Sequence, residues 1–260
     1  MEFKPKKKLG QNFLINDKIL DKIVKVGNIT DKDNILEIGP GTGNLTKYLI
    51  KAKPKSIVVI EKDTDLINQL KQRFEDRIKV INEDVLRLNE NFFTKKFKVF
   101  GNLPYNISTK ILSNWCLNNN IRFEKLILMF QKEVADRIIS KENTKNYSRI
   151  TILANWKFDI KKKFDINPGN FYPAPKIQSS VLEFIPKKKI YKIKDPRNLE
   201  HLTRVLFNQR RKMIKKNILK LFTNFDKILK ITNIKLTDRP QNISVKKFLD
   251  LVVEYEKNLN

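Results

Sequence analysis

The chain has 260 residues and a formal net charge of +26, with 54 Lys and Arg against 28 Asp and Glu. This excess of positive charge indicates a polyanionic partner such as a nucleic acid. One cysteine and one histidine exclude an internal disulfide and a Cys/His zinc site. No segment is apolar for long enough to span a membrane, so we expect a cytoplasmic protein that needs no metal.

The N-terminal run Lys4-Pro5-Lys6-Lys7-Lys8 is too short for a targeting peptide, and no apolar stretch follows it. We expect it to be a mobile basic arm.

A strand-like run at Asn34–Ile38 leads directly into a glycine-rich loop, and a helix-like segment follows at 44–50. Three of the seven glycines of the chain lie in this loop: Gly39, Gly41 and Gly43. Strand, glycine loop and helix form the layout by which a Rossmann-type fold lets a nucleotide approach the backbone. The G-x-G-x-G spacing and the missing N–H of Pro40 favour a ligand without phosphates over a dinucleotide.

The next two strand candidates end near acidic residues. The β-branched run Ser56–Ile60 is followed by Glu61, at a strand tip where a carboxylate can bind ribose hydroxyls. The run Ile78–Ile81 ends near Asp84, which can accept a hydrogen bond from an adenine amine. Asp84 is almost as well suited to cap a helix that begins at Val85, and the two roles are compatible.

A fourth strand-like run, Phe97–Phe100, leads into the turn sequence Gly-Asn-Leu-Pro-Tyr-Asn. Pro104 stiffens this turn, so the Asn102 amide oxygen and the Leu103 carbonyl are two acceptors that it can direct to one side. Tyr105 adds a flat aromatic face. Two acceptors beside an aromatic plane suit a planar ring with an exocyclic amine, such as adenine, although Asn and Pro are also ordinary turn residues.

The chain changes character at Pro186, where a late strand candidate at 179–185 gives way to a lysine run. Helical patterns then cover four segments: Leu199–Leu206, Met213–Phe222, Phe225–Ile231 and Ser244–Tyr255. Ser244 is suited to be the N-cap of the last. Residues 187–260 hold 20 Lys and Arg against 7 Asp and Glu. The segment Gln209–Lys216 predicts a basic helix along nucleic-acid phosphates, with four candidate contacts: Arg210, Arg211, Lys212 and Lys215.

Alternating strand-like and helix-like runs from Asp31 to Phe130 indicate an α/β fold with a mostly parallel sheet. We expect the strand at 179–185 in an antiparallel hairpin that ends this sheet. The sequence therefore predicts two domains. Residues 1–186 form a Rossmann-like domain with the basic arm, and residues 187–260 form a small, strongly basic all-α domain.

These features resemble the class I S-adenosylmethionine-dependent methyltransferases that act on adenine N6. They are most similar to the dimethyladenosine transferases of small-subunit ribosomal RNA. Further motifs follow the order of that family along almost the whole chain: Leu9–Leu14, Phe130–Arg137, Phe171–Lys176, Ser179–Val181 and Phe207–Lys212.

The resemblance implies S-adenosylmethionine as cofactor and S-adenosylhomocysteine as product. The cofactor-binding positions that it implies are Asn12, Leu14, Gly39, Gly41, Glu61, Asp84 and Asn102. It also implies that Asn102 holds the target amine, next to the Leu103 carbonyl already inferred from the turn. Tyr105 and Phe171 are implied to stack on the two faces of the target base. By the same resemblance, residues 1–186 are the catalytic methyltransferase domain and residues 187–260 bind RNA.

The implied reaction gives N6-dimethyladenosine at two adjacent adenosines of a hairpin near the 3′ end of 16S rRNA. The implied partner is small-subunit rRNA in a pre-30S particle, bound by a monomer with a role in small-subunit biogenesis. Two alternatives remain: an antibiotic-resistance relative that methylates a large-subunit adenine, and a mainly non-catalytic assembly factor. Three features favour the small-subunit enzyme: Leu103, where resistance enzymes more often carry Ile, the Ser179–Val181 motif, and the expected helix at Gln209–Lys212. The intact cofactor positions argue against lost catalysis.

Overall fold

The computed structural model describes residues 5–6, 10–88, 92 and 95–259. Contacts divide the chain into two compact units. The first comprises Met1–Asn114, Asn120–Ala135 and Asp159–Pro186, and the second Trp115–Asn119, Asp136–Phe158 and Lys187–Asn260. Four residues of the basic arm and the first motif lie outside the described residues: Lys4, Lys7, Lys8 and Leu9.

This division differs from the predicted single cut after Pro186. The helix α6 (Arg149–Lys157) packs against α7 (Pro196–Phe207) and α10 (Val245–Asn258). Most residues of α6 are buried on every side of the helix, and such a helix requires apolar partners all round. A segment from the middle of the chain therefore completes the C-terminal helical unit.

Among the described residues, the first unit is built on a seven-stranded sheet in the order β4-β3-β2-β5-β6-β9-β7. Its strands are β2 (Asn34–Ile38), β3 (Ser56–Glu61), β4 (Lys79–Asn82), β5 (Phe97–Asn102), β6 (Phe123–Gln131), β7 (Phe158–Ile166) and β9 (Ser179–Pro186). The pairs β2–β3, β2–β5, β3–β4 and β5–β6 are parallel, and β9 is antiparallel to β6. The predicted mostly parallel Rossmann-like sheet, with an antiparallel strand near its end, is confirmed.

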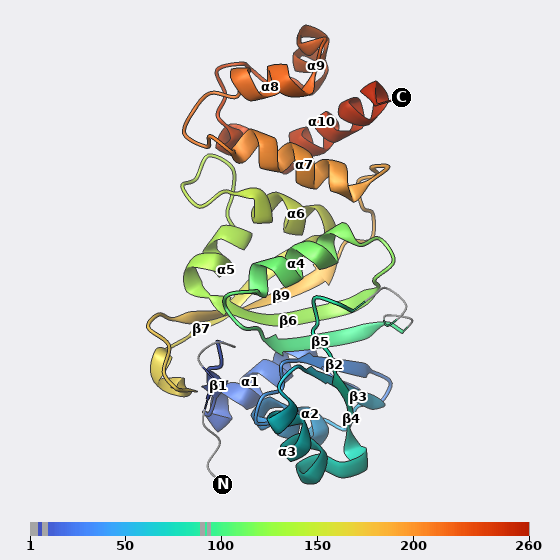
Figure 1. Cartoon of the computed structure of the whole chain (residues 1–260), viewed down its shortest axis with the longest axis vertical. Coiled ribbons are helices and arrows are strands. Elements are labelled where there is room, and N and C mark those ends of the chain that lie inside the picture. Colours follow the sequence, from blue (N-terminus) through green and yellow to red (C-terminus); the bar gives the residue numbers. More distant parts are fainter. Residues whose placement is uncertain (1–4, 7–9, 89–91, 93–94, 260) are drawn as a thin grey trace. The chain divides into compact units, whose positions relative to one another are not determined.

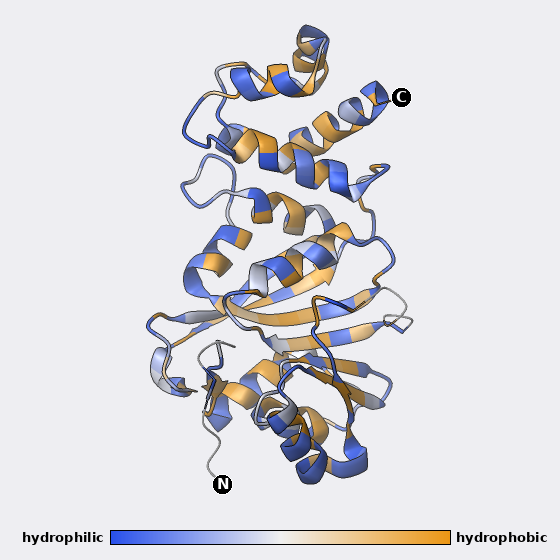
Figure 2. Ribbon diagram, viewed as in Figure 1, coloured by the Kyte–Doolittle hydropathy of each residue, from blue (hydrophilic) through white to orange (hydrophobic). Residues whose placement is uncertain are grey.

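The central strands are buried on both faces, as is typical of parallel sheets. Leu36, Val99 and Phe100 are fully shielded from solvent, and Figure 2 shows β5 and β6 as largely hydrophobic ribbons. The strands β3 and β5 run beyond the predicted apolar runs and include Glu61 and Asn102 as their last residues. Both polar residues are thus placed at strand ends by the sheet itself.

Three helices lie beside the β2, β3 and β4 end of the sheet (Figure 1). These are α1 (Asp17–Gly27), α2 (Asn44–Lys51) and α3 (Thr64–Phe74). Gly27 allows α1 to approach the sheet closely, because a Cβ there would lie 2.4 Å from the Phe100 ring. Two further helices, α4 (Ser108–Leu117) and α5 (Lys132–Ile138), follow β5 and β6 along the chain.

A second, two-stranded sheet joins β1 (Phe13–Leu14) to β8 (Phe171–Tyr172) in antiparallel register. The Ile15 N–H extends it by donating to the Asn170 carbonyl at 2.9 Å. This short ribbon ties the N-terminal segment to a loop more than a hundred residues later in the chain.

The second unit contains α6 and α7, then α8 (Lys215–Leu221), α9 (Phe225–Thr232) and α10. Figure 1 shows α7 and α10 side by side, and both contact other helices of the unit. The prediction that Ser244 caps the last helix is confirmed, because its hydroxyl accepts a hydrogen bond from the Lys247 N–H at 3.3 Å. No helix in the described part of the chain is long and apolar enough to cross a membrane.

The predicted basic helix at Gln209–Lys216 is wrong over most of its length. Residues 208–211 form a turn, residues 212–214 are irregular, and α8 begins at Lys215. The cause lies at Ile214, which is fully buried and donates its N–H to the Asp238 carbonyl at 2.8 Å. That bond replaces the intrahelical bond to residue 210 that a continuous helix requires.

Candidate active site

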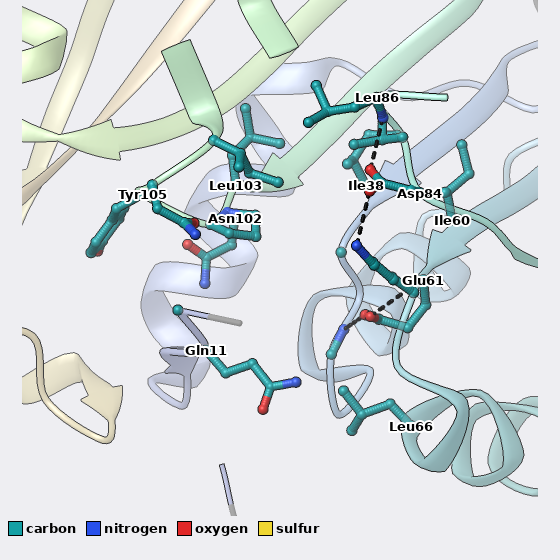
Figure 3. Close-up of a pocket in the computed structure, with 18 of the residues that line it drawn as sticks. Gln11, Ile38, Ile60, Glu61, Leu66, Asp84, Leu86, Asn102, Leu103 and Tyr105 are labelled. Atoms are coloured by element: carbon teal, nitrogen blue, oxygen red, sulfur yellow. Dashed lines mark hydrogen bonds and ion pairs between the residues drawn. The ribbon is translucent and has the colours of Figure 1, made fainter. Parts of the chain in front are cut away.

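A pocket of about 230 Å³ lies where β2, β3, β4 and β5 end (Figure 3). β2 is the turning point of the strand order, since its neighbours are β3 on one side and β5 on the other. In open α/β sheets, ligands bind outside the carboxyl ends of the strands at such a switch point. Every residue that lines the pocket belongs to the first unit.

The glycine loop brings bare backbone to the pocket. Gly39, Gly41 and Gly43 adopt positive φ angles of 65°, 58° and 80°, which L side chains rarely adopt. A Cβ on Gly41 would lie 2.6 Å from the Phe13 ring, and one on Gly43 would lie 2.4 Å from the Phe74 ring. The loop therefore requires glycine for conformation and for space, and it leaves room for a ligand at Gly39.

Glu61 is held in one orientation by three backbone donors. Its Oε2 accepts from the Gly41 N–H at 3.2 Å, and its Oε1 accepts from the N–H groups of Lys62 and Asp63 at 2.8 and 2.9 Å. Burial raises the pKa of this carboxyl group, while these donors oppose the rise. A carboxylate fixed in this way at a pocket wall can accept hydrogen bonds from the two hydroxyls of a ribose.

Asp84 lies on the same side of the pocket, after β4 (Figure 3). Its Oδ1 accepts from the Leu86 N–H at 2.9 Å and its Oδ2 from the Lys62 ammonium at 3.0 Å. These two contacts lower the pKa of Asp84. Residues 85–87 form a turn, not the predicted helix, so Asp84 caps a turn.

Apolar side chains complete this part of the pocket: Ile38, Ile60, Leu66, Val85, Leu86 and Leu103. Apolar walls with a few convergent polar groups suit a flat heteroaromatic ring attached to a sugar.

The turn after β5 supplies the other side of the pocket. The Asn102 side-chain amide donates to the Asn12 carbonyl at 2.7 Å. The Pro104 carbonyl accepts from the N–H groups of Ile107 and Ser108 at 3.1 and 3.0 Å, which locks the turn onto the start of α4. Asn102, Leu103 and Tyr105 all line the pocket, so the structure brings the three predicted residues together.

Tyr105 is fixed at its hydroxyl end. Its hydroxyl oxygen lies 2.6 Å from Ser179 Oγ, a fully buried group at the start of β9. Burial raises the pKa of the Tyr105 hydroxyl, so it remains protonated at neutral pH. This hydrogen bond holds the ring in place between the turn that carries Tyr105 and the strand that carries Ser179.

The N-terminal segment closes the pocket through a clasp that the sequence did not indicate. Gln11 donates to Asp63 Oδ2 at 3.0 Å, and the Lys6 ammonium lies 2.7 Å from Asp63 Oδ1 and 2.8 Å from Asp65 Oδ2. Gln11 and Asn12 line the pocket. The expectation of a mobile arm is therefore wrong at Lys6, because two carboxylates at the start of α3 bind its ammonium.

Two predicted residues lie elsewhere. Leu14 is 5% exposed and borders a smaller hollow, which Gly39 and Asn102 also line. Phe171 is 3% exposed in the hydrophobic core and does not line the pocket. The reason is the register of β1 and β8, which pairs Phe171 with Leu14 on the inward face of the ribbon. The structure thus does not bring Phe171 and Tyr105 to opposite sides of the pocket.

Glu37 is a further site residue that sequence reasoning missed. It is 1% exposed on β2, borders the smaller hollow, and accepts a hydrogen bond from the Thr46 hydroxyl at 2.7 Å. Burial raises its pKa to about 8. An acidic residue in the middle of an otherwise apolar strand was the available signal.

The predicted RNA contacts in the second unit fall into two groups. The Arg210 guanidinium is half-buried and donates to the carbonyls of Thr144 and Lys145. The other three side chains are exposed: Arg211, Lys212 and Lys215. Arg210 therefore holds the loop at 144–145, whereas the other three are accessible to phosphates.

Comparison with known proteins gives one consistent result. The model of the family described as "Ribosomal RNA adenine dimethylase" matches residues 2–257. A protein of Pelagibacter ubique (strain HTCC1062) named Ribosomal RNA small subunit methyltransferase A is 53% identical over 259 residues, which is 98% of each chain. A protein of the same name from the Wolbachia of Drosophila simulans (strain wRi) is 40% identical over 253 residues, 94% of this chain and 91% of the relative.

Among solved structures, a dimethyladenosine transferase from Plasmodium falciparum is similar with a TM-score of 0.78 and 27% identity. The similarity covers 94% of this chain and 98% of that one.

Proposed function

Because this chain belongs to the ribosomal RNA adenine dimethylase family, we propose that it dimethylates N6 of two adjacent adenosines in a hairpin near the 3′ end of 16S rRNA. S-adenosylmethionine is the cofactor and leaves as S-adenosylhomocysteine. The observation that carries the proposal is the Asn102 amide, whose nitrogen is committed to the Asn12 carbonyl at 2.7 Å. Its oxygen is therefore available, beside the Leu103 carbonyl, to accept from an adenine amine.

The residues present fit the cofactor. Glu61 and Asp84 supply fixed acceptors for ribose hydroxyls and for an adenine amine, and the loop glycines leave a bare cradle toward Asn102. The cofactor would supply an electrophilic methyl group on a sulfonium, from which a neutral thioether leaves readily. The chain consequently has mainly to position the two reactants.

Adenine N6 is a poor nucleophile because its lone pair is delocalised into the ring. Hydrogen bonds from N6–H to the Asn102 oxygen and the Leu103 carbonyl favour a pyramidal nitrogen whose lone pair is directed away from the ring. The turn is held by Asn12 and by the start of α4 before any substrate binds. Acceptors that are already in place need no reorganisation during the reaction.

The target base must leave its stack to enter the pocket, which costs a few kcal/mol. Stacking on an aromatic ring returns about 1–3 kcal/mol per base, and Tyr105 lines the pocket with its ring fixed by Ser179. The family role of Phe171 on the second face of the base would require that ring to rotate out of the core, where it is 3% exposed.

The partner that we propose is small-subunit rRNA in a pre-30S particle, bound by a monomer in the cytoplasm as a step of small-subunit biogenesis. Residues 187–260 carry 20 Lys and Arg against 7 Asp and Glu, a balance suited to a phosphate backbone. We propose Arg211, Lys212 and Lys215 as direct phosphate contacts, and Arg210 as support for the neighbouring loop.

The test is to incubate the purified protein with labelled S-adenosylmethionine and, separately, with unmethylated small and large ribosomal subunits. The RNA is then digested and the modified nucleoside is identified, with the Asn102→Ala variant as the inactive control. Dimethyladenosine confined to the small subunit is the expected result. Label in the large subunit would support the resistance-type alternative, and tight binding without label would support an assembly factor.

A further inference from the structure

The two faces of the β1–β8 ribbon differ sharply in exposure. In antiparallel pairs, residues directly opposite each other project to the same face, and neighbours along a strand project to opposite faces. Leu14 pairs with Phe171, and both are buried at 5% and 3%. Phe13 pairs with Tyr172 on the other face, where Tyr172 is 56% exposed.

This outer face adjoins the pocket. Phe13 lines the pocket and packs its ring against the backbone of Gly41. Tyr172 lies directly opposite Phe13 on the neighbouring strand, β8. Ile15, two residues after Phe13 and hence on the same face, is 52% exposed. The outer face of the ribbon, where Phe13 reaches the pocket, thus also carries an aromatic and an aliphatic side chain in contact with solvent.

Nothing in the described part of the chain explains why a tyrosine should be exposed here. No described residue forms a hydrogen bond with its hydroxyl, and its ring stacks on no described aromatic side chain. The same loop carries Lys176, which is exposed and has no acidic partner among the described residues. An exposed aromatic ring and an unpaired cation four residues apart in one loop are suited to bind an unstacked nucleotide and its phosphate.

We propose that Tyr172 is a stacking platform for the nucleotide that flanks the target adenine, with Lys176 contacting its phosphate. The inference rests on the proposed function, because it presumes an RNA strand that enters the pocket with one base extruded. A flanking base stacked on Tyr172 fixes the strand on the outer side of the ribbon. In this arrangement Tyr105 stacks on the target base, and Tyr172 stacks on the base next to it in the RNA strand.

The test uses unmethylated small ribosomal subunits whose rRNA carries the fluorescent base 2-aminopurine at the position before or after the two adjacent adenosines. Stacking on Tyr172 should quench the fluorescence when the protein binds. Tyr172→Ala should abolish the quenching and raise the KM for RNA about tenfold, the effect of losing one stacked base. The KM for S-adenosylmethionine should not change.

Two further variants distinguish stacking on the Tyr172 ring from the loss of its hydroxyl group and from the loss of any exposed side chain. Tyr172→Phe keeps the aromatic face and should retain the quenching and the KM for RNA. Ile185→Ala removes a side chain of the same unit that is 40% exposed on β9, and it serves as the matched control.

The platform is overturned if Tyr172→Ala methylates and quenches like the parent, or if Tyr172→Phe is as defective as Tyr172→Ala. A parent protein that methylates rRNA without quenching at either position would overturn the platform alone. A parent that neither binds nor methylates the RNA would overturn the proposed function as well.

Discussion

The Asn102 side chain donates its amide to the main-chain oxygen of Asn12, 2.7 Å away and 90 positions earlier in the chain. A carbonyl can only accept, so this contact decides which end of the Asn102 amide is nitrogen and which is oxygen. The residue that closes the pocket therefore also orients the proposed acceptor of the target amine.

We expect Asn102→Ala to lower kcat at least 10²–10³-fold, the range for loss of a preorganised transition-state hydrogen bond. Asn102→Asp should be similarly impaired, because a carboxylate cannot donate to the Asn12 carbonyl. RNA affinity should remain within about twofold of the parent, since phosphate contacts dominate it. Single-turnover transfer from labelled S-adenosylmethionine and filter binding measure the two quantities.

The control for this prediction is Asn114→Ala, at an exposed position of α4. An active Asn102→Ala variant would refute the proposed contact with the target amine.

The clasp at Asp63 predicts an effect on cofactor binding. Although burial opposes it, hydrogen bonds from Lys6 and Gln11 lower the pKa of Asp63, so the carboxylate is ionised at neutral pH. Asp63→Ala should release the N-terminal segment and raise the KM for S-adenosylmethionine roughly three- to tenfold. The KM for RNA should change less.

The control for the clasp is Asp65→Ala. Asp65 shares Lys6, but its side chain is 65% exposed and makes no contact with Gln11. Its removal should have little effect, as is usual for exposed ion pairs. Equal effects of the two variants on the cofactor KM would show that the clasp acts only through net charge.

Glu37 predicts a pH dependence of stability. Its pKa is raised by burial from 4.5 to about 8, so the native protein binds more protons than the unfolded chain between these values. The contribution of Glu37 to stability is therefore complete below pH 4.5 and is lost as the pH rises toward 8. In Glu37→Gln this loss should disappear. The difference in free energy of unfolding between variant and parent should therefore shift in favour of the variant by up to a few kcal/mol from pH 5 to pH 8. Urea unfolding followed by circular dichroism at both pH values measures it, with Glu142→Gln, at an exposed position, as control. A parallel pH response of parent and Glu37→Gln would show that the buried carboxyl is not the cause.

The segment at 208–214 predicts different roles for adjacent arginines. Replacing Arg211 and Lys212 together by Ala should weaken RNA binding and reduce the slope of log K against log salt by about 1.5, because two phosphate contacts are lost. Arg210→Ala should instead loosen the loop whose carbonyls it binds, with a smaller change in slope. Binding titrations between low and physiological salt measure these slopes. Lys227→Ala with Lys230→Ala, two exposed lysines of α9, is the matched pair, and an equal change there would indicate binding by net charge alone.

The sequence by itself was sufficient to predict the sheet and the pocket residues at the ends of its strands. Apolar runs bounded by Glu61, Asp84 and Asn102 predict strands, and in a parallel sheet strand ends meet at one edge whatever the detailed packing. The glycine loop is equally local, because positive φ angles and close ring contacts both require glycine. Hence the fold class and the cofactor side of the site follow from residues close together in the chain.

Only the tertiary structure decided how distant segments meet. The contacts of Asn102 with Asn12, of Tyr105 with Ser179 and of Asp63 with Lys6 join segments 57 to 90 positions apart, and no local pattern marks them. Strand register is also decided only in the folded structure, because a shift by one residue moves every side chain of a strand to the opposite face of the ribbon. Because Leu14 pairs with Phe171, Phe171 is buried in the core and Tyr172 is exposed to solvent.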